Sequence, residues 1–207
     1  MTTSVTAESL SRRPKRADAC RNYDKLIEAA RDAFAEDGAD ASLEAIARGA
    51  GVGIGTLYRH FPSRQDLLEA VYVEEVETLC RSADGLSDLP PWEALVDWLH
   101  AFVGYVATKR ALSSELLATV GMESAVFRKC HDAIREAGEP LLVRAQKAKV
   151  VRADTDFMDL IRMVSGITMI KSADAEQIDR ILGLALDGLR YRSGGDRPAR
   201  RARPARH

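Results

Sequence analysis

Cysteines, aromatic residues and long apolar runs are all scarce in this chain of 207 residues. Cys20, Cys80 and Cys130 are odd in number and far apart, so the sequence favours neither a disulfide framework nor a zinc site. No apolar run approaches the roughly 20 residues that cross a bilayer, and Met1–Ser11 is polar rather than a signal-peptide core. We therefore expect a cytoplasmic protein in a reducing compartment.

Motifs that carry catalysis or hold a cofactor are absent as well. The chain has no nucleophile elbow, no phosphate-binding glycine loop and no HExxH sequence. Its histidines and cysteines do not fall at the paired spacing of metal ligands. The acidic pair Glu74 and Glu75 falls on the solvated face of a predicted helix, where charge is expected. We predict a protein that is not an enzyme and that needs no metal or other cofactor.

Sustained period-two alternation is lacking too, so no strand signal competes with the helical pattern. Apolar residues recur at helical spacing along most of the chain. The sequence predicts an all-α fold of about nine helices, near Tyr23–Asp37, two short helices within 42–61, Arg64–Ala83, Trp92–Lys109, Ser113–Val120, Ser124–Lys149, Thr155–Lys171 and Ala175–Tyr191. Pro140 predicts a kink or break near Gly138.

The most informative segment that is present runs from Ser42 to Phe61, SLEAIARGAGVGIGTLYRHF. Ser42 can cap a first short helix, and three glycines crowd the turn that follows, where positive φ and close helix approach are tolerated. Leu57 and Phe61 give the second short helix an apolar side, whereas its other side carries small and hydrogen-bonding residues. A unit of this kind places one helix in the major groove of DNA, so the segment predicts a helix-turn-helix.

The run GVGIGTLYRHFPSRQDLLEAV, with LEAIARGA before it, closely resembles the DNA-binding domain of TetR/AcrR-type bacterial transcriptional regulators. The upstream stretch RNYDKLIEAARDAFAEDGADAS resembles the family's first helix and following loop, so the resemblance covers roughly residues 21–75. Further on, RAQKAKVVRADTDFMDL and AEQIDRILGLALDGLR resemble an actinobacterial-type subgroup. The resemblance implies an N-terminal three-helix DNA-binding domain followed by a C-terminal helical bundle for ligand binding and dimerisation.

The candidate DNA contacts follow from the resemblance and from side-chain chemistry. In the family, the positions of Tyr58 and His60 bond phosphates and that of Thr56 reaches base edges. A thymine methyl group suits an apolar side chain, a base or phosphate suits arginine, and helix starts favour phosphate. The set is Ser42, Gly53, Ile54, Thr56, Tyr58, Arg59, His60 and Arg64. Gly53 departs from the serine, threonine or alanine that is commoner in the family. The alternative is that Tyr58 and His60 only pack the small domain.

Two apolar stripes near the C-terminus form a candidate partner surface. In the resembled family, the last two helices pair with those of a second subunit as a four-helix bundle. We therefore expect a homodimer whose interface includes Leu160, Val164, Ile167, Ile178, Ile181, Leu182, Ala185, Leu186 and Leu189. The alternative is that both stripes line the core of the monomer.

A pocket for an apolar small molecule is a third expectation, because aromatic and methionine side chains with a few polar groups suit such a site. The candidate lining residues are Trp98, Phe102, Tyr105, Met122, Phe127, Cys130 and His131. The alternative is that these residues form ordinary core.

Charge divides the chain unevenly: the net charge is +1 over residues 1–64, −8 over 65–189 and +6 over 190–207. An acidic body is compatible with DNA binding at one end, because only the facing surface must be positive. We expect a basic flexible arm over 1–20, the helix-turn-helix domain over 21–66, a ligand-binding and dimerisation domain over 67–191 and a basic disordered tail over 192–207.

The sequence thus predicts a sequence-specific DNA-binding transcriptional regulator. In the resembled family such a protein is most often a repressor that acts as a homodimer on a near-palindromic double-stranded operator and is released by a small-molecule effector. The alternatives are an activator of the same fold and a helical protein-interaction adaptor without DNA function. A small-molecule-binding or catalytic helical protein is disfavoured by the missing catalytic motifs.

Overall fold

The computed structural model describes residues 13–120, 125–170 and 174–191. Within these ranges the chain is all-α, as predicted, with eight α-helices and one short 3-10 helix and no strand. The helices are α1 (Ala17–Asp37), α2 (Leu43–Gly49), α3 (Ile54–His60), α4 (Arg64–Asp84), α5 (Pro91–Val120), α6 (Ala125–Lys147), α7 (Phe157–Thr168) and α8 (Ala175–Asp187), and the 3-10 helix η1 is Gly38–Asp40. The predicted tail and Met122 lie outside the described residues, as does the predicted arm up to residue 12.

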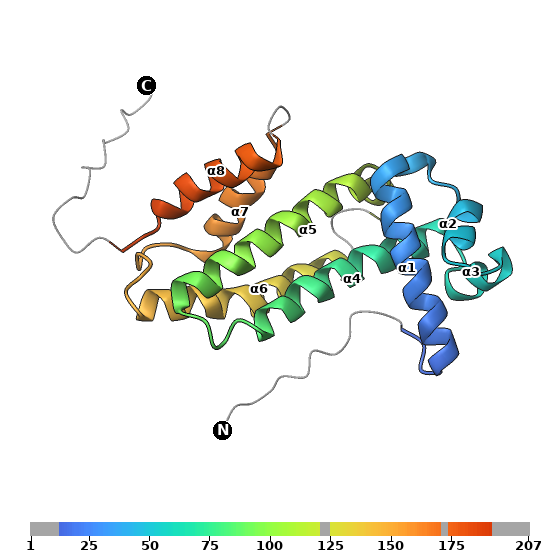
Figure 1. The fold of residues 1–207 in the computed structure, drawn as a ribbon, viewed down its shortest axis with the longest axis horizontal. Helices are drawn as coiled ribbons and strands as arrows, with labels where there is room; N and C mark the ends of the chain where they lie inside the picture. The colour runs from blue at the N-terminus through green and yellow to red at the C-terminus, as the bar shows by residue number, and fades with distance from the viewer. Residues whose placement is uncertain (1–12, 121–124, 171–173, 192–207) are drawn as a thin grey trace.

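The helices are arranged as an end domain and a longer body (Figure 1). α1, α2 and α3 gather at one end of the molecule, and α4, α5 and α6 run lengthwise away from them. α7 packs on α5 and α6, and α8 packs on α7. α4 therefore belongs to both parts, since it packs on α1 at one end and on α5 and α6 along its length.

Local sequence signals set the helix starts. Ser42 caps α2 by accepting a hydrogen bond from the amide of Ala45, as the sequence predicts. Ser63 and Asp66 form a full capping box at the start of α4, with backbone-to-side-chain distances of 3.0 and 3.2 Å. These caps fix the residues at which α2 and α4 begin, and these two helices precede and follow α3 in the chain.

The number and bounds of the helices differ from the prediction in two places. The stretches expected as separate helices, Trp92–Lys109 and Ser113–Val120, form the single helix α5, so the described residues hold eight α-helices rather than nine. The residues between them include no glycine or proline, and arginine, alanine and leucine there are strong helix formers. α1 begins at Ala17 rather than near Tyr23.

The centre of the body is the Trp98 side chain of α5, which is fully buried. The centroid of its ring lies 5.9 Å from the ring centroid of Phe102 and 5.9 Å from that of Phe157. α6 passes through Pro140 without a break and places Gly138 directly against these rings. A Cβ atom at Gly138 would lie 2.6 Å from Trp98 Cζ3 and 2.7 Å from Phe157 Cζ, so a glycine is what allows α6 to pack this closely.

The loop after α4 is held by one side chain of α6. The Arg144 guanidinium donates to the carbonyl oxygens of Leu86, Ser87 and Leu89 at 3.1, 2.7 and 2.9 Å. This contact fixes the far end of α4 to the body. Among the described residues, none of the helices combines the length and the hydropathy that a membrane span requires.

Candidate DNA-binding surface and ligand pocket

The turn between α2 and α3 depends on one glycine in particular. Gly51 has a φ of +67°, a conformation that side chains with a Cβ rarely adopt. After it, the amide of Val52 donates to the carbonyl of Ala47 at 2.9 Å, and the Gly53 carbonyl accepts from Thr56 at 2.8 Å. These bonds close the turn and start α3, so the angle between the two short helices is set by the backbone.

α3 has one buried face and one exposed face. Leu57 is fully buried, and Phe61, which follows the helix, is also in the core. Away from this buried contact, Ile54 is 36% exposed and Tyr58 is 47% exposed, and Gly53, Gly55 and Arg59 are exposed too. Thr56 and His60 are half-buried. A solvent-facing apolar side chain, a phenol and a guanidinium thus project from a helix whose other face is anchored.

Three of the predicted contact residues also hold the domain together. The His60 ring packs edge-on against Tyr23, with centroids 6.2 Å apart. The Arg64 guanidinium donates to the carbonyl of Ala41 and lies over the Phe34 ring, 5.1 Å from its centroid. Arg64 therefore fastens the start of α4 to the end of α1 and to the loop before α2.

The third of these residues, Ser42, is engaged within its own helix start. Its hydroxyl donates to the Glu44 carboxylate at 2.9 Å while accepting from the Ala45 amide. Hydrogen bonds from the Glu44 amide and from Ser42 lower the pKa of Glu44, which therefore stays ionised at neutral pH. The amino terminus of α2 thus already carries a negative charge, which competes with a phosphate for that position.

The predicted interface residues divide into two groups. Within the single chain, the buried group is Leu160, Val164, Ile167, Leu182, Leu186 and Leu189, and the half-buried group is Ile178, Ile181 and Ala185. The first group lies in the core of the single chain, as the alternative for these stripes expects. The apolar side chains most open to a partner are Leu184, at 76% exposed, and Met169, at 61%.

Leu184 was missed because it lies off the main stripe of α8. The signal was nevertheless present in the sequence: Ile181, Leu184 and Gly188 recur at spacings of three and four residues, as a second and narrower stripe.

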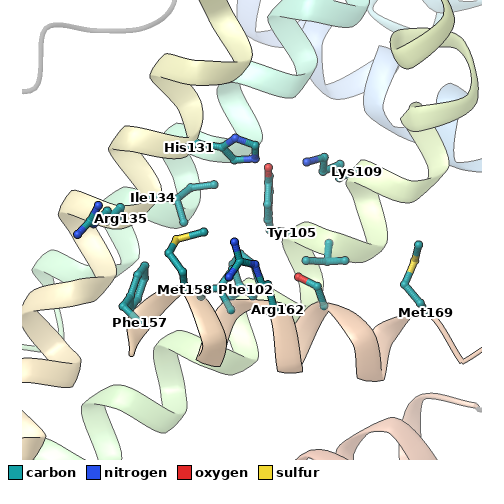
Figure 2. A pocket seen from close by; sticks show the side chains of 13 residues that line it. Phe102, Tyr105, Lys109, His131, Ile134, Arg135, Phe157, Met158, Arg162 and Met169 are labelled. Carbon is teal, nitrogen blue, oxygen red and sulfur yellow. The ribbon is translucent and has the colours of Figure 1, made fainter. Parts of the chain in front are cut away.

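A cavity of about 430 Å³ lies between α5, α6 and α7 (Figure 2). It is lined by Phe102, Tyr105, Val106, Lys109, His131, Ile134, Arg135, Phe157, Met158, Ile161, Arg162, Ser165 and Met169. Of the candidate pocket residues, Phe102, Tyr105 and His131 line this cavity. Trp98, Phe127 and Cys130 do not; all three are buried in the core instead.

The basic lining residues of the cavity were not predicted, but one of them had a signal. Lys109 continues the stripe Trp98, Phe102, Tyr105 on α5 at spacings of three and four residues. Its ammonium lies 5.7 Å from the centroid of the Tyr72 ring and 5.9 Å from that of Phe127. Burial lowers the pKa of Lys109. Burial and the nearby Lys109 charge also lower the pKa of His131.

Two phenols join this cavity to α4. The Tyr105 hydroxyl donates to the Tyr72 hydroxyl at 3.1 Å, and both side chains are buried. Burial raises the pKa of Tyr72 to about 12 and raises the pKa of Tyr105 as well, so both phenols are neutral at ordinary pH. Within the described ranges, no three His, Cys, Asp or Glu side chains gather closely enough to hold a metal ion.

Comparison with known proteins gives two matching family models. Residues 26–71 match the model described as bacterial regulatory proteins, tetR family, and residues 90–191 match that of the SbtR-like transcriptional regulator C-terminal domain. The HTH-type transcriptional regulator UidR of Escherichia coli (strain K12) is 27% identical over 179 residues, which are 83% of this chain and 90% of that protein.

Two solved structures are similar over nearly their whole length. The TetR transcriptional regulator SCO0520 from Streptomyces coelicolor is 40% identical, with a TM-score of 0.74, and the match covers 83% of this chain and 99% of that one. The TetR transcription regulatory protein from Mycobacterium vanbaalenii is 32% identical, with a TM-score of 0.67, over 86% of this chain and 99% of that one.

Proposed function

The chain belongs to the TetR family of bacterial DNA-binding transcriptional regulators, and from this premise we propose that it is a repressor that binds a near-palindromic operator as a homodimer and is released by a small-molecule ligand. The observation that carries the proposal is the exposed face of α3, which projects from an anchored buried face at the end of the molecule. In this proposal α3 is the recognition helix.

The contacts proposed for α3 follow from what each side chain can do at that face. Tyr58 is an exposed hydroxyl donor for a phosphate oxygen, and Arg59 is an exposed guanidinium for a phosphate or a guanine edge. Ile54, at the start of the helix, suits a thymine methyl group. Thr56 reaches a base edge, and Gly53 lets the backbone approach. His60 acts mainly by packing α3 against Tyr23 of α1, and Arg64 by holding the start of α4.

The dimer surface in the proposal is the outer layer formed by α7 and α8. Leu184 and the half-buried Ile181 would meet their copies across a two-fold axis, which removes apolar surface from water. Two recognition helices about one DNA turn apart, roughly 34–36 Å, then fit two half-sites of a near-palindrome.

Ligand release requires that the ligand prefers one arrangement of the two DNA-binding domains over the other. The cavity supports a route for this preference, because the Tyr105–Tyr72 hydrogen bond connects its wall to α4. α4 in turn is joined to α1 by the ion pair between Glu75 and Arg31, at 2.5 Å. A ligand that moves Tyr105 would therefore act on the helix that carries the DNA-binding domain.

Selection of bound sequences from random duplex DNA tests the proposal. Recovery of a near-palindrome supports it, and the affinity for that sequence is then measured for two tyrosine variants. Tyr58→Ala is expected to weaken binding roughly tenfold or more, because a hydrogen bond to a charged phosphate is lost in each half-site. Tyr191→Ala is the matched control: Tyr191 is 46% exposed against 47% for Tyr58, and it follows α8, a helix that lies apart from α1, α2 and α3 (Figure 1).

Unchanged operator affinity in Tyr58→Ala would contradict the assigned face of α3. A reporter gene placed behind the selected sequence separates repression from activation, since a repressor lowers its transcription and an activator raises it. Recovery of no motif at low salt would favour the adaptor reading.

A further inference from the structure

The charged side chains that line the cavity are all basic. Its lining includes Lys109, His131, Arg135 and Arg162, and none of the thirteen lining residues carries a carboxylate. Most of the remaining wall is apolar, with Phe102, Ile134, Phe157, Met158 and Ile161 among its members. A cavity with an apolar wall and only basic ionisable groups complements a molecule that is apolar along its body and negatively charged at one point.

The basic groups are not equivalent, because two of them already have anionic partners. Arg135 bonds Glu139 at 3.0 Å, and Arg162 bonds Asp159 at 3.4 Å. Both arginines are exposed to solvent. Lys109 is half-buried, and its ammonium lies over the faces of the Tyr72 and Phe127 rings. Of the basic side chains in the lining, Lys109 therefore gains the most from an anionic ligand.

His131 is exposed as well, but it lies on the neighbouring helix beside Lys109 and can donate to the same anion. Figure 2 shows His131, Lys109 and the hydroxyl end of Tyr105 gathered on one side of the cavity, with Phe157 and Met158 on the other. Burial and the positive charge of Lys109 lower the pKa of His131, so the neutral imidazole can donate a hydrogen bond to an anion. An anion between them would satisfy the ammonium and accept from the imidazole.

We infer that the cavity binds an apolar carboxylate whose head group lies between Lys109 and His131 and whose body packs against Phe102, Phe157 and Met158. The inference rests on the proposed ligand-binding function and adds the chemical class of the ligand. The cavity volume of about 430 Å³ is in the range of small-molecule sites, roughly 300–1,000 Å³. The same head group would draw Lys109 away from the Tyr72 ring, which is part of α4.

Titration calorimetry of the full chain with three ligands of equal chain length tests the inference. The probes are decanoate, decan-1-ol and decyltrimethylammonium, which carry a negative, a neutral and a positive head. Decanoate is expected to bind roughly tenfold or more tightly than decan-1-ol, as a charge-assisted hydrogen bond provides, and the cationic probe most weakly. Equal affinities for the three, or no binding of decanoate, would overturn the inference.

Lys109→Met assigns the effect to its residue. This variant is expected to lose the preference for decanoate over decan-1-ol while keeping the affinity for decan-1-ol. The matched control is Lys147→Met, which changes an exposed lysine on α6 that does not line the cavity and should keep the preference. Loss of the preference in Arg162→Met, with Lys109→Met unaffected, would overturn the assignment.

Two further readouts keep the result interpretable. Because burial of the ammonium is unfavourable, Lys109→Met is expected to melt at the same temperature as the unaltered protein or higher, so a binding loss cannot be attributed to unfolding. Operator affinity is measured separately with and without decanoate. Charge-selective binding without an effect on operator affinity would uphold this inference and contradict ligand release, whereas a ligand effect on operator affinity without charge selectivity would do the reverse.

Discussion

The contact between α6 and the Trp98 ring gives the sharpest prediction of stability. In Gly138→Ala the new Cβ atom would lie 2.6 Å from Trp98 Cζ3 and 2.7 Å from Phe157 Cζ. Carbon atoms in proteins pack best at about 3.5–4.0 Å, so the two rings would have to yield by about 1 Å. Both rings are buried, at 0% and 2% exposed, and have no solvent side to move into.

The expected magnitude follows from two opposing contributions. Overpacking a core by one carbon costs about 1–3 kcal/mol, whereas replacing a glycine in a helix by alanine contributes about 0.5–1 kcal/mol in favour of the fold. We therefore expect Gly138→Ala to lower the free energy of unfolding by about 1–2 kcal/mol. For a chain of this length, that corresponds to a melting temperature lower by roughly 2–8 °C.

Gly104→Ala is the matched comparison, because it makes the same chemical change inside α5 at a position where a Cβ atom would meet nothing within 4 Å. Here only the helix contribution remains, so the melting temperature should rise by roughly 1–4 °C. Both variants are melted by differential scanning calorimetry at one protein concentration, since the proposed dimerisation would make the melting temperature depend on it. A shift of the same sign in both variants would refute the reasoning.

Three further predictions concern the dimer surface, the loop after α4 and pH. Leu184→Glu places a charge at an apolar side chain that is 76% exposed and should convert a dimer to monomer in light scattering; a persisting dimer would place the interface elsewhere. Arg144→Met removes three hydrogen bonds to loop carbonyls and should lower the free energy of unfolding, measured in urea, by about 1–3 kcal/mol. Lys147→Met, at an exposed position, should lower it by less than about 0.5 kcal/mol. Burial raises the pKa of Cys130 and of Tyr72 to about 12, from ordinary values of 9.0 and 10.0, so the unfolded chain ionises first. The contribution of these two groups to the free energy of unfolding is complete below about pH 9 and is lost as the pH rises toward 12. The urea midpoint should therefore fall between pH 8 and about pH 10.5. A constant midpoint would contradict this prediction.

What could be predicted from the sequence was mostly local. Ser42 and Ser63 were identified as caps because a cap needs only residues within one turn of the chain. The division of α3 into buried and exposed positions was also predictable, since Leu57 and Phe61 recur four residues apart on one side, whereas Tyr58 and Arg59 are polar residues between them. Each of these features is confirmed by the burial and hydrogen bonds of the DNA-binding domain.

The lining of the cavity could not be predicted in full, because it depends on how closely separate helices approach. Trp98, Phe102 and Tyr105 share one stripe on α5, and nothing in that stripe distinguishes core from cavity wall. Gly138, far away in the sequence, brings α6 onto Trp98 and closes that end of the stripe. The cavity therefore opens beside Phe102 and Tyr105 instead.

The attachment of α4 at its far end has a mechanical consequence. Arg144 fixes the loop that follows Asp84, whereas the other end of α4 carries the DNA-binding domain through Arg64. At about 1.5 Å per residue, Tyr72 lies roughly 18 Å and Arg64 roughly 30 Å from Asp84 along the helix. A rigid helix that turns about its fixed end acts as a lever, so a sideways displacement at Tyr72 becomes about 1.7 times larger at Arg64. The cavity wall meets this lever part-way along its arm, and the DNA-binding domain is attached at the tip.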